Sequence, residues 1–175
     1  MAPIGRQQRG RNMQVKDVMV RTPAACGPQT NLAEAAAILW DRNCGILPIV
    51  DPQQQVTGVV TDRDLCIAMG TRNRLPGEIS LAQVASGKVY SCRSDDTIPG
   101  ALEIMTRHKV RRLIVVDGQG RLEGILSMDD IVLHAEPAVA GKTPELSSDS
   151  VVKTLKAIYG PQLPQVARSA AGAAN

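Results

Sequence analysis

The sequence predicts a mixed α+β fold, in which two tandem βαββα units pack on each other about a pseudo-twofold axis. The first observation is an internal repeat, because a shift of 66 residues lays residues 15–68 over residues 81–134 without a gap. Ten of the 54 aligned pairs are identical, where average residue frequencies give about three by chance. The second observation is size: a unit of about 55 residues cannot bury both faces of its own sheet. We therefore expect the pair of units, and not the single unit, to be the fold.

The first unit begins with a short edge strand and an alanine-rich helix. Asn31 and Glu34 have the spacing of a capping box, in which each side chain bonds the backbone N–H of the other residue. Two β-branched apolar runs around a short turn then predict a hairpin. The expected elements are a strand at Pro23–Cys26, a helix from Asn31 to about Asp41, strands at Ile46–Val50 and Val56–Val60, and a helix at Asp62–Met69.

The second unit repeats this order. Pro99 is tolerated in its first helix because it falls in the first turn, where a missing N–H breaks no helical bond. The expected elements are a strand at Val89–Cys92, a helix from about Thr97 to His108, strands at Arg112–Val116 and Leu122–Leu126, and a helix at Met128–Ala135.

Composition marks the segments outside the two units. We expect a flexible basic arm at residues 1–12, the units at 13–72 and 79–135, a linker at 136–147, a C-terminal helix at 148–160 and a disordered tail at 161–175. The C-terminal helix has Val151, Val152, Leu155 and Ile158 on one predicted face. A helix of about 11 residues is marginal by itself. We therefore expect it to dock on the module or on a partner.

Composition and charge argue against several classes of function. The net charge of +3 comes from Arg6, Arg9 and Arg11, because the rest of the chain has 17 basic and 17 acidic residues. Aromatic residues make up 2% of the chain, which disfavours a single-stranded nucleic-acid binder; binding of nucleic acid through the arginine arm stays a weak alternative. No apolar run reaches the roughly 18 residues of a membrane span, and no signal-peptide pattern is present. We expect a cytoplasmic protein with no membrane partner.

Residues that support catalysis or metal binding are sparse. His108 and His134 are the two histidines, and neither stands in a recognisable order with a nucleophile and an acid. The four cysteines lack the C-x-x-C spacing of zinc sites, so we expect reduced thiols, no metal and no enzyme. His108 is expected to be a solvated residue at the end of its helix, and Trp40 an anchor in the core or at an interface.

A seven-residue motif links the hairpin of each unit to the following helix. Gly58–Asp64 and Gly124–Asp130 both read G-h-h-[ST]-x-x-D, where h is apolar. A Ser or Thr followed three residues later by an acid is a capping box. The motif also suits ligand binding, because amides at a helix N-terminus attract anions and a carboxylate can accept hydrogen bonds from a ribose diol. Both interpretations remain open from the sequence.

Two repeats of this length and order, the strand Gly45–Asp51 and the doubled motif resemble a CBS-domain pair, also called a Bateman module. The resemblance covers about residues 13–135 and is nearest to the small stand-alone proteins of that family. It implies a regulatory module that binds AMP, ADP, ATP or S-adenosylmethionine in clefts between the repeats, requires no cofactor and forms homodimers. Such a module signals to a regulated protein by conformational change. The alternative is an interaction module without a ligand, which acts through the C-terminal helix.

The resemblance also implies roles for single positions. Asp64 and Asp130 match the ribose-binding aspartates of the family, while Thr61 and Ser127 match hydroxyls near ribose and phosphate. The remaining positions are Arg63, Arg111 and Arg112 for phosphate, Gly45 and Ile46 as first-unit counterparts of the last two, and Ala24 and Tyr90 around the base. Guanidinium groups suit phosphate because they donate two parallel hydrogen bonds. Since the arginines have no basic counterparts in the other repeat, we expect two clefts of unequal affinity.

Overall fold

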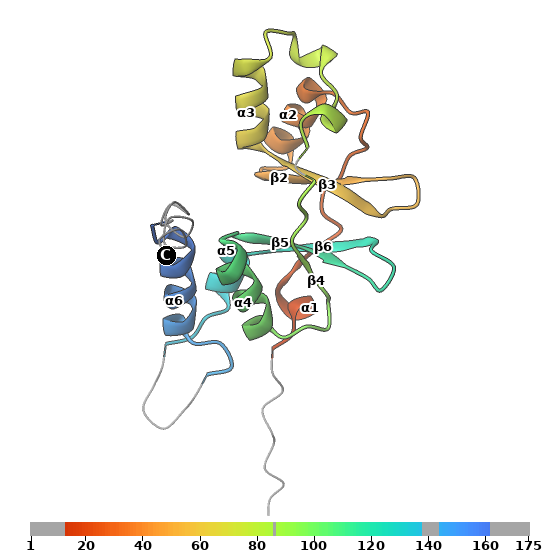
Figure 1. Ribbon diagram of the computed structural model, residues 1–175. Coiled ribbons are helices and arrows are strands. Elements are labelled where there is room, and N and C mark those ends of the chain that lie inside the picture. The colour runs from red at the N-terminus through yellow and green to blue at the C-terminus, as the bar shows by residue number, and fades with distance from the viewer. Residues whose placement is uncertain (1–12, 86, 138–143, 162–175) are drawn as a thin grey trace, which may run out of the picture.

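The computed structural model describes residues 13–85, 87–137 and 144–161. They form two lobes that are joined by two chain segments (Figure 1). The predicted N-terminal arm, half of the predicted linker and nearly all of the predicted tail lie outside the described residues.

The first lobe is a β-hairpin covered by helices. Its elements are α2 (Leu32–Asp41), β2 (Ile46–Val50), β3 (Val56–Thr61), α3 (Asp62–Thr71) and two short 3-10 helices at Pro76–Glu78 and Leu81–Gln83. The predicted capping box at the start of α2 is confirmed. The Asn31 side chain accepts from the Glu34 N–H at 3.0 Å, and the Asn31 N–H donates to Glu34 Oε2 at 3.3 Å.

The second lobe has a larger sheet, because the N-terminal segment joins it. Its elements are α1 (Val15–Val18), β1 (Val20–Arg21), β4 (Ser91–Cys92), α4 (Ile98–His108), β5 (Arg112–Val116), β6 (Leu122–Ser127), α5 (Met128–Leu133) and α6 (Ser148–Tyr159). The strand order is β1-β6-β5-β4, with β1 and β5 antiparallel to β6 and β4 parallel to β5.

The two hairpins are copies of each other, and their turns hold the lobes together. Both strand pairs shift register at the same place, between Ile49 and Val50 and between Val115 and Val116, which are 66 residues apart. The turns then bond across the lobes. The Val56 N–H donates to the Gly120 carbonyl at 3.1 Å, and an antiparallel bridge joins Gln55 to Arg121.

The predicted strand at Pro23–Cys26 is reduced to a single bridge, which matches the pairing of its counterpart Cys92 with Val115. Within that segment Cys26 alone forms a bridge, parallel to Ile49 of its own lobe. An additional strand that was not predicted, β1, lies earlier in the chain and pairs with β6 in the sheet of the second lobe. Between these contacts Thr22 has φ of 51°, a left-handed conformation that turns the chain, and Pro23 has no N–H to donate to a ladder. The chain therefore leaves one sheet before it reaches the next.

Each lobe takes part of its core from the other half of the sequence. Ile79 and Leu81 are fully buried in the core of the first lobe, whereas Val15 and Val18 are buried in the core of the second. The apolar residues at the start of each unit thus pack in the opposite lobe. This exchange explains how two small units can each complete a core.

The C-terminal helix α6 docks on the second lobe. Val151 and Ile158 are buried against its core and Leu155 packs partly against it, so the expected docking on the module is confirmed. The prediction is wrong for Val152, which is 47% exposed, because α6 turns Thr154 inward instead. It is also wrong for a core position of Trp40, whose side chain is 86% exposed on α2.

Candidate functional site

Both copies of the G-h-h-[ST]-x-x-D motif form capping boxes at a strand-to-helix junction. Thr61 ends β3 and caps α3: its hydroxyl donates to Asp64 Oδ2 at 2.7 Å and its N–H donates to the same oxygen at 2.9 Å. Ser127 caps α5 in the same way, at 2.5 and 3.0 Å from Asp130 Oδ2. The predicted local structure is therefore present in both repeats.

The capping role occupies one side of each carboxylate. In the described part of the chain, the hydrogen bonds that the carboxylates of Asp64 and Asp130 accept all go to Oδ2. The second oxygen, Oδ1, can accept hydrogen bonds from a ligand without breaking the cap, since a carboxylate offers about four acceptor sites. The structural and the ligand-binding interpretations of the motif are thus compatible.

Asp64 lies in a cleft between the two lobes, which we call the first cleft. It has a volume of about 340 Å³. Its walls come from both repeats: Ile46, Val59, Thr61 and Asp64 from the first lobe, and Lys88, Tyr90, Val110, Arg111, Arg112 and Ile114 from the second. The structure therefore brings the predicted arginines of the second repeat to the aspartate of the first.

Asp130 lies in a separate cleft, which we call the second cleft. Its volume is about 380 Å³. It is lined by Val20, Thr22, Pro23, Ala24, Arg42, Asn43, Cys44, Gly45, Ile46, Arg112, Ile125, Ser127, Asp129 and Asp130. Ala24, Gly45 and Ile46 of the first repeat are thus placed with Ser127 and Asp130 of the second.

The same sequence positions line both clefts, with the repeats exchanged. Thr22, Ala24 and Gly45 in the second cleft correspond, 66 residues on, to Lys88, Tyr90 and Arg111 in the first. Ile46 and its counterpart Arg112 line both clefts. This exchange is what a pseudo-twofold relation between the repeats requires.

The two clefts differ in charge. The first has the basic residues Lys88, Arg111 and Arg112 in its walls and the single acid Asp64. The second has two basic residues, Arg42 and Arg112, and two acids, Asp129 and Asp130. Arg112 is also within 3.7 Å of the Asp129 carboxylate, which offsets its charge there. An anionic ligand is therefore favoured in the first cleft.

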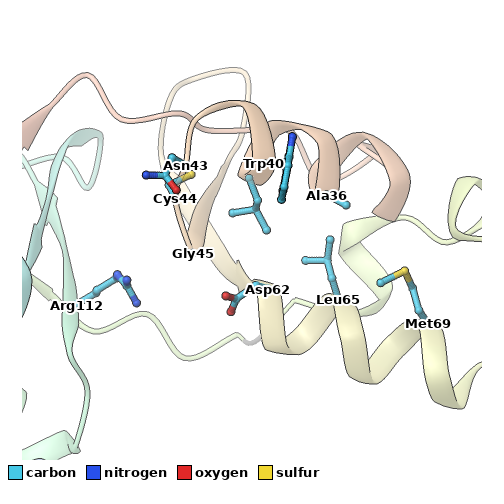
Figure 2. A pocket seen from close by; sticks show the side chains of 10 residues that line it. Ala36, Trp40, Asn43, Cys44, Gly45, Asp62, Leu65, Met69 and Arg112 are labelled. Carbon is cyan, nitrogen blue, oxygen red and sulfur yellow. The ribbon is translucent and has the colours of Figure 1, made fainter.

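Arg112 reaches across to the first lobe and lies beside Gly45 (Figure 2). A Cβ atom added at Gly45 would lie 3.4 Å from Asp62 Oδ2 and 3.6 Å from Arg112 Nη2. Both are ordinary van der Waals distances, so the Arg112 guanidinium lies next to Gly45 without depending on the missing side chain. Figure 2 shows Arg112 extending from its strand toward Asp62 and Gly45.

Two residues that line the first cleft, Tyr90 and Arg111, are held by contacts with helices of the second lobe. The Tyr90 ring, which lines the cleft, stacks on the His108 ring with centroids 4.4 Å apart and planes at 23°. His108 is exposed at the end of α4, as expected, but its ring also backs Tyr90. Arg111 Nη1 donates to the Tyr159 hydroxyl of α6 at 3.0 Å.

Some predicted site residues lie elsewhere, and some residues of the clefts escaped prediction. Arg63 is exposed and lines neither cleft. Lys88, Arg42 and Asp129 were not predicted. Lys88 could have been found from the repeat. It lies two residues before the predicted site residue Tyr90, just as its counterpart Thr22 lies two residues before the predicted site residue Ala24.

A third hollow lies between α2 and α3, where Asp62 of the first motif lines it, and it shares Gly45 and Arg112 with the second cleft. It has a volume of about 490 Å³ and is lined by Ala36, Leu39, Trp40, Asn43, Cys44, Gly45, Asp62, Leu65, Met69 and Arg112. In Figure 2 the side chains of Leu65 and Met69 on α3 face α2, where Trp40 stands at the rim. We call this surface the α2/α3 groove.

The cysteines differ in accessibility. Burial raises the pKa of the Cys26 thiol to about 11, and burial together with the charge of Asp96 raises the pKa of the Cys92 thiol to about 12. Cys66 is exposed on α3 and Cys44 is half-buried, and all four thiols are free. Among the described residues, no group of three His, Cys, Asp or Glu side chains is arranged to hold a metal ion. No described helix is long and apolar enough to cross a membrane.

Comparison with known proteins identifies the repeat. The sequence matches the CBS domain family twice, at residues 15–70 and 81–136. The CBS domain-containing protein YhcV of Bacillus subtilis (strain 168) is 31% identical over 120 residues, which are 69% of this chain and 84% of that protein.

Solved structures of CBS-domain pairs have the same fold. The CBS domain protein PAE2072 from Pyrobaculum aerophilum, in complex with AMP, has a TM-score of 0.62 at 25% identity and covers 68% of this chain and 90% of its own. The CBS domain pair of protein MJ0100, in complex with 5'-methylthioadenosine and S-adenosyl-L-methionine, has a TM-score of 0.63 at 25% identity and covers 69% and 98%. With its doubled match and this fold, the chain belongs to the CBS domain family and is a tandem pair of CBS repeats.

Proposed function

We propose that this protein is a regulatory module that binds an adenine nucleotide, AMP, ADP or ATP, in the first cleft. The observation that supports this best is the meeting of Asp64, which keeps Oδ1 available, with Lys88, Arg111 and Arg112 in one cleft. Solved relatives of similar fold hold AMP or other adenosyl ligands. A ligand with a ribose diol at one end and phosphate at the other fits this pairing of groups.

In the proposed complex the ribose hydroxyls donate to Asp64 Oδ1, with the Thr61 hydroxyl beside them. The phosphates accept hydrogen bonds from Arg111 and Arg112, whose guanidinium groups are charged at every physiological pH. The base lies toward Tyr90, whose ring is held by its stacking on His108. These groups bind and orient a ligand, and we propose no bond-breaking step for them.

The second cleft is proposed to bind the same class of ligand more weakly when it carries phosphates. Asp129 faces that cleft where the first cleft has no second acid. Repulsion between Asp129 and phosphate opposes nucleotides, whereas an adenosyl ligand without phosphates, such as S-adenosylmethionine, escapes it. Its ribose is proposed to meet Asp130, with Ala24 beside the base.

Calorimetric titration with AMP, ADP, ATP and S-adenosylmethionine tests this proposal. Replacing Asp64 by Asn keeps the size of the cap but removes the charged acceptor. We expect nucleotide binding at the first cleft to weaken by about 1.5–3 kcal/mol, roughly 10- to 150-fold. Asp130→Asn is expected to affect the weaker site only.

The chain offers a matched control for the loss of a cap. Glu34→Ala removes an N3 carboxylate from the capping box of α2, which lines neither cleft. It is expected to lower stability by about 1 kcal/mol and to leave nucleotide affinity unchanged. No binding of any of the four ligands at millimolar concentration, or equal affinities for the unmodified protein and the double variant Asp64→Asn, Asp130→Asn, would contradict the proposal.

We also propose that two copies associate through the α2/α3 groove. The face of α4 that corresponds to this surface is covered by α6 of the same chain: Leu102 and Thr106, which line the space beside α6, are the counterparts of Ala36 and Trp40. The first lobe has no such cover among the described residues. A projecting Trp40 beside a groove supplies both halves of a self-complementary contact, as a twofold interface needs.

The interaction module without a ligand is the less favoured alternative. It requires the apolar face of the C-terminal helix for a partner, but Val151 and Ile158 are buried in the core of the second lobe. A regulated protein is part of the proposal, and its binding is expected to change when the first cleft is filled.

A further inference from the structure

The loop between α4 and β5 belongs to two parts of the molecule at once. Val110, Arg111 and Arg112 line the first cleft. The same loop contacts the last turn of α6, where Arg111 Nη1 donates to the Tyr159 hydroxyl at 3.0 Å and Lys109 Nζ donates to the Gly160 carbonyl at 3.3 Å. Arg111 therefore connects the C-terminal helix to the first cleft, because it contacts Tyr159 of α6 and also lines the cleft.

Tyr159 holds the Arg111 guanidinium in two ways. Besides the hydrogen bond, the central guanidinium carbon lies 5.8 Å from the centroid of the Tyr159 ring, within the range of a cation–π contact. Arg111 is exposed, and an exposed arginine otherwise samples many rotamers. The contact with Tyr159 removes part of that freedom before any ligand arrives.

The contact leaves donors for a second partner. A guanidinium has five N–H groups, and the Tyr159 hydroxyl takes one of them. Arg111 contacts Tyr159 and lines the first cleft in one and the same conformation. A phosphate in the cleft and the Tyr159 hydroxyl can therefore be bound together, so they assist each other instead of competing.

We infer that Tyr159 is a positioning residue of the first cleft, which orders Arg111 for a ligand phosphate, and that a bound phosphate in turn strengthens the docking of α6. The second half follows from the first, because the coupling between two binding equilibria is reciprocal. The inference rests on the proposed nucleotide binding. It assigns to the C-terminal helix, which lies outside both matched repeats, a part in sensing the ligand.

Calorimetry on the full chain with AMP, ADP and ATP tests the first half, with adenosine as the phosphate-free ligand. Tyr159→Phe keeps the ring and loses the hydroxyl, and is expected to weaken phosphate-bearing ligands about threefold; Tyr159→Ala loses both contacts and is expected to weaken them about tenfold. Tyr159 is 65% exposed, so both variants are expected to fold. Adenosine affinity is expected to stay unchanged, which a general loosening of the fold would not produce.

Two further variants isolate the contact. Val152→Ala changes an exposed apolar side chain two turns earlier on α6 and is expected to leave all affinities unchanged. In an Arg111→Ala background, Tyr159→Phe is expected to have no additional effect, since the residue that it positions is gone.

Hydrogen exchange of residues 148–159 tests the second half. Saturating AMP is expected to slow exchange there in the unmodified protein and to leave it unchanged in Arg111→Ala. If the unmodified protein binds nucleotides and Tyr159→Phe binds them equally well or more tightly, the role of Tyr159 is wrong while the proposed function stands. Failure of AMP, ADP and ATP to bind the unmodified protein overturns the proposed function with it.

Discussion

At the scale of single residues, Asp64 and Asp130 show why a capping motif can also be a ligand motif. One oxygen of each carboxylate closes the cap and the other stays available. The cap was predictable because its partners are three residues apart. The arginines around Asp64 were predictable as residues but not in their place, since the sequence does not show how the lobes cross. Lys88 lies in the same cleft as these arginines because of the way the two lobes pack on each other.

The thiols give a prediction at the same scale. Alkylation by iodoacetamide at pH 8 is expected to modify Cys66 rapidly and to leave Cys26 and Cys92 unmodified in the folded protein. The first is exposed, while the other two are buried and have raised pKa values. Since the thiolate is the reactive form, mass spectrometry after short exposure reads the order directly. Modification of Cys26 as fast as Cys66 would contradict this order.

The raised thiol pKa values also predict a pH dependence of stability. Between about pH 9 and 11 the folded protein keeps the Cys26 proton that the unfolded chain releases. The free energy of unfolding is therefore expected to fall as pH rises through this window. Urea unfolding at pH 8 and pH 10.5 measures the fall, which is expected to be smaller in Cys26→Ala than in the unmodified protein. An equal fall in both would show that Cys26 does not contribute.

At the scale of elements, β1 shows what periodicity cannot predict. It has two residues, both exposed, so it carries neither an apolar run nor a clear alternation. The hairpins were predicted well because each turn is flanked by strands of five and six residues that are rich in apolar side chains. The C-terminal helix was predicted with nearly correct bounds, but its inward face was shifted by the presence of Thr154 in the core.

Gly124 is the position on which β1 depends. A Cβ atom there would lie 2.7 Å from the Val20 carbonyl oxygen and 2.9 Å from Met19 Sδ, closer than folded proteins allow. Gly124→Ala is therefore expected to lower the free energy of unfolding by about 1–3 kcal/mol. Thermal unfolding followed by circular dichroism measures this, and Gly27→Ala, with nothing within 4 Å of its added Cβ, is expected to change it by less than about 0.5 kcal/mol.

At the scale of the whole molecule, the repeat accounts for both the likeness and the inequality of the clefts. The same positions build both, but substitutions between the copies have gathered basic residues in one. The sequence predicted this inequality, and the structure assigns Arg111 to the Asp64 side and Arg112 to both. The cleft in which a basic residue lies depends on contacts between the two lobes. Such long-range contacts leave no local pattern in the sequence, so the assignment could not be predicted from it.

The proposed association of two copies has a direct test. Trp40→Glu places a charge at the rim of the α2/α3 groove and is expected to convert a dimer into a monomer, as measured by sedimentation equilibrium. Leu75→Glu is the control, because Leu75 is 69% exposed but does not line the groove. A monomeric unmodified protein, or a dimer that survives Trp40→Glu, would contradict the proposed interface.

The exchange of core residues between the lobes has a consequence for how the protein comes apart. Ile79 and Leu81 complete one core, and Val15 and Val18 the other. A cut between the repeats would leave each fragment short of apolar side chains that its own lobe requires. In the intact chain, unfolding of one lobe would remove core residues from the other. Heat or denaturant is therefore expected to unfold both lobes in a single cooperative transition. We therefore expect that neither repeat folds when it is expressed alone, although the two repeats share one architecture.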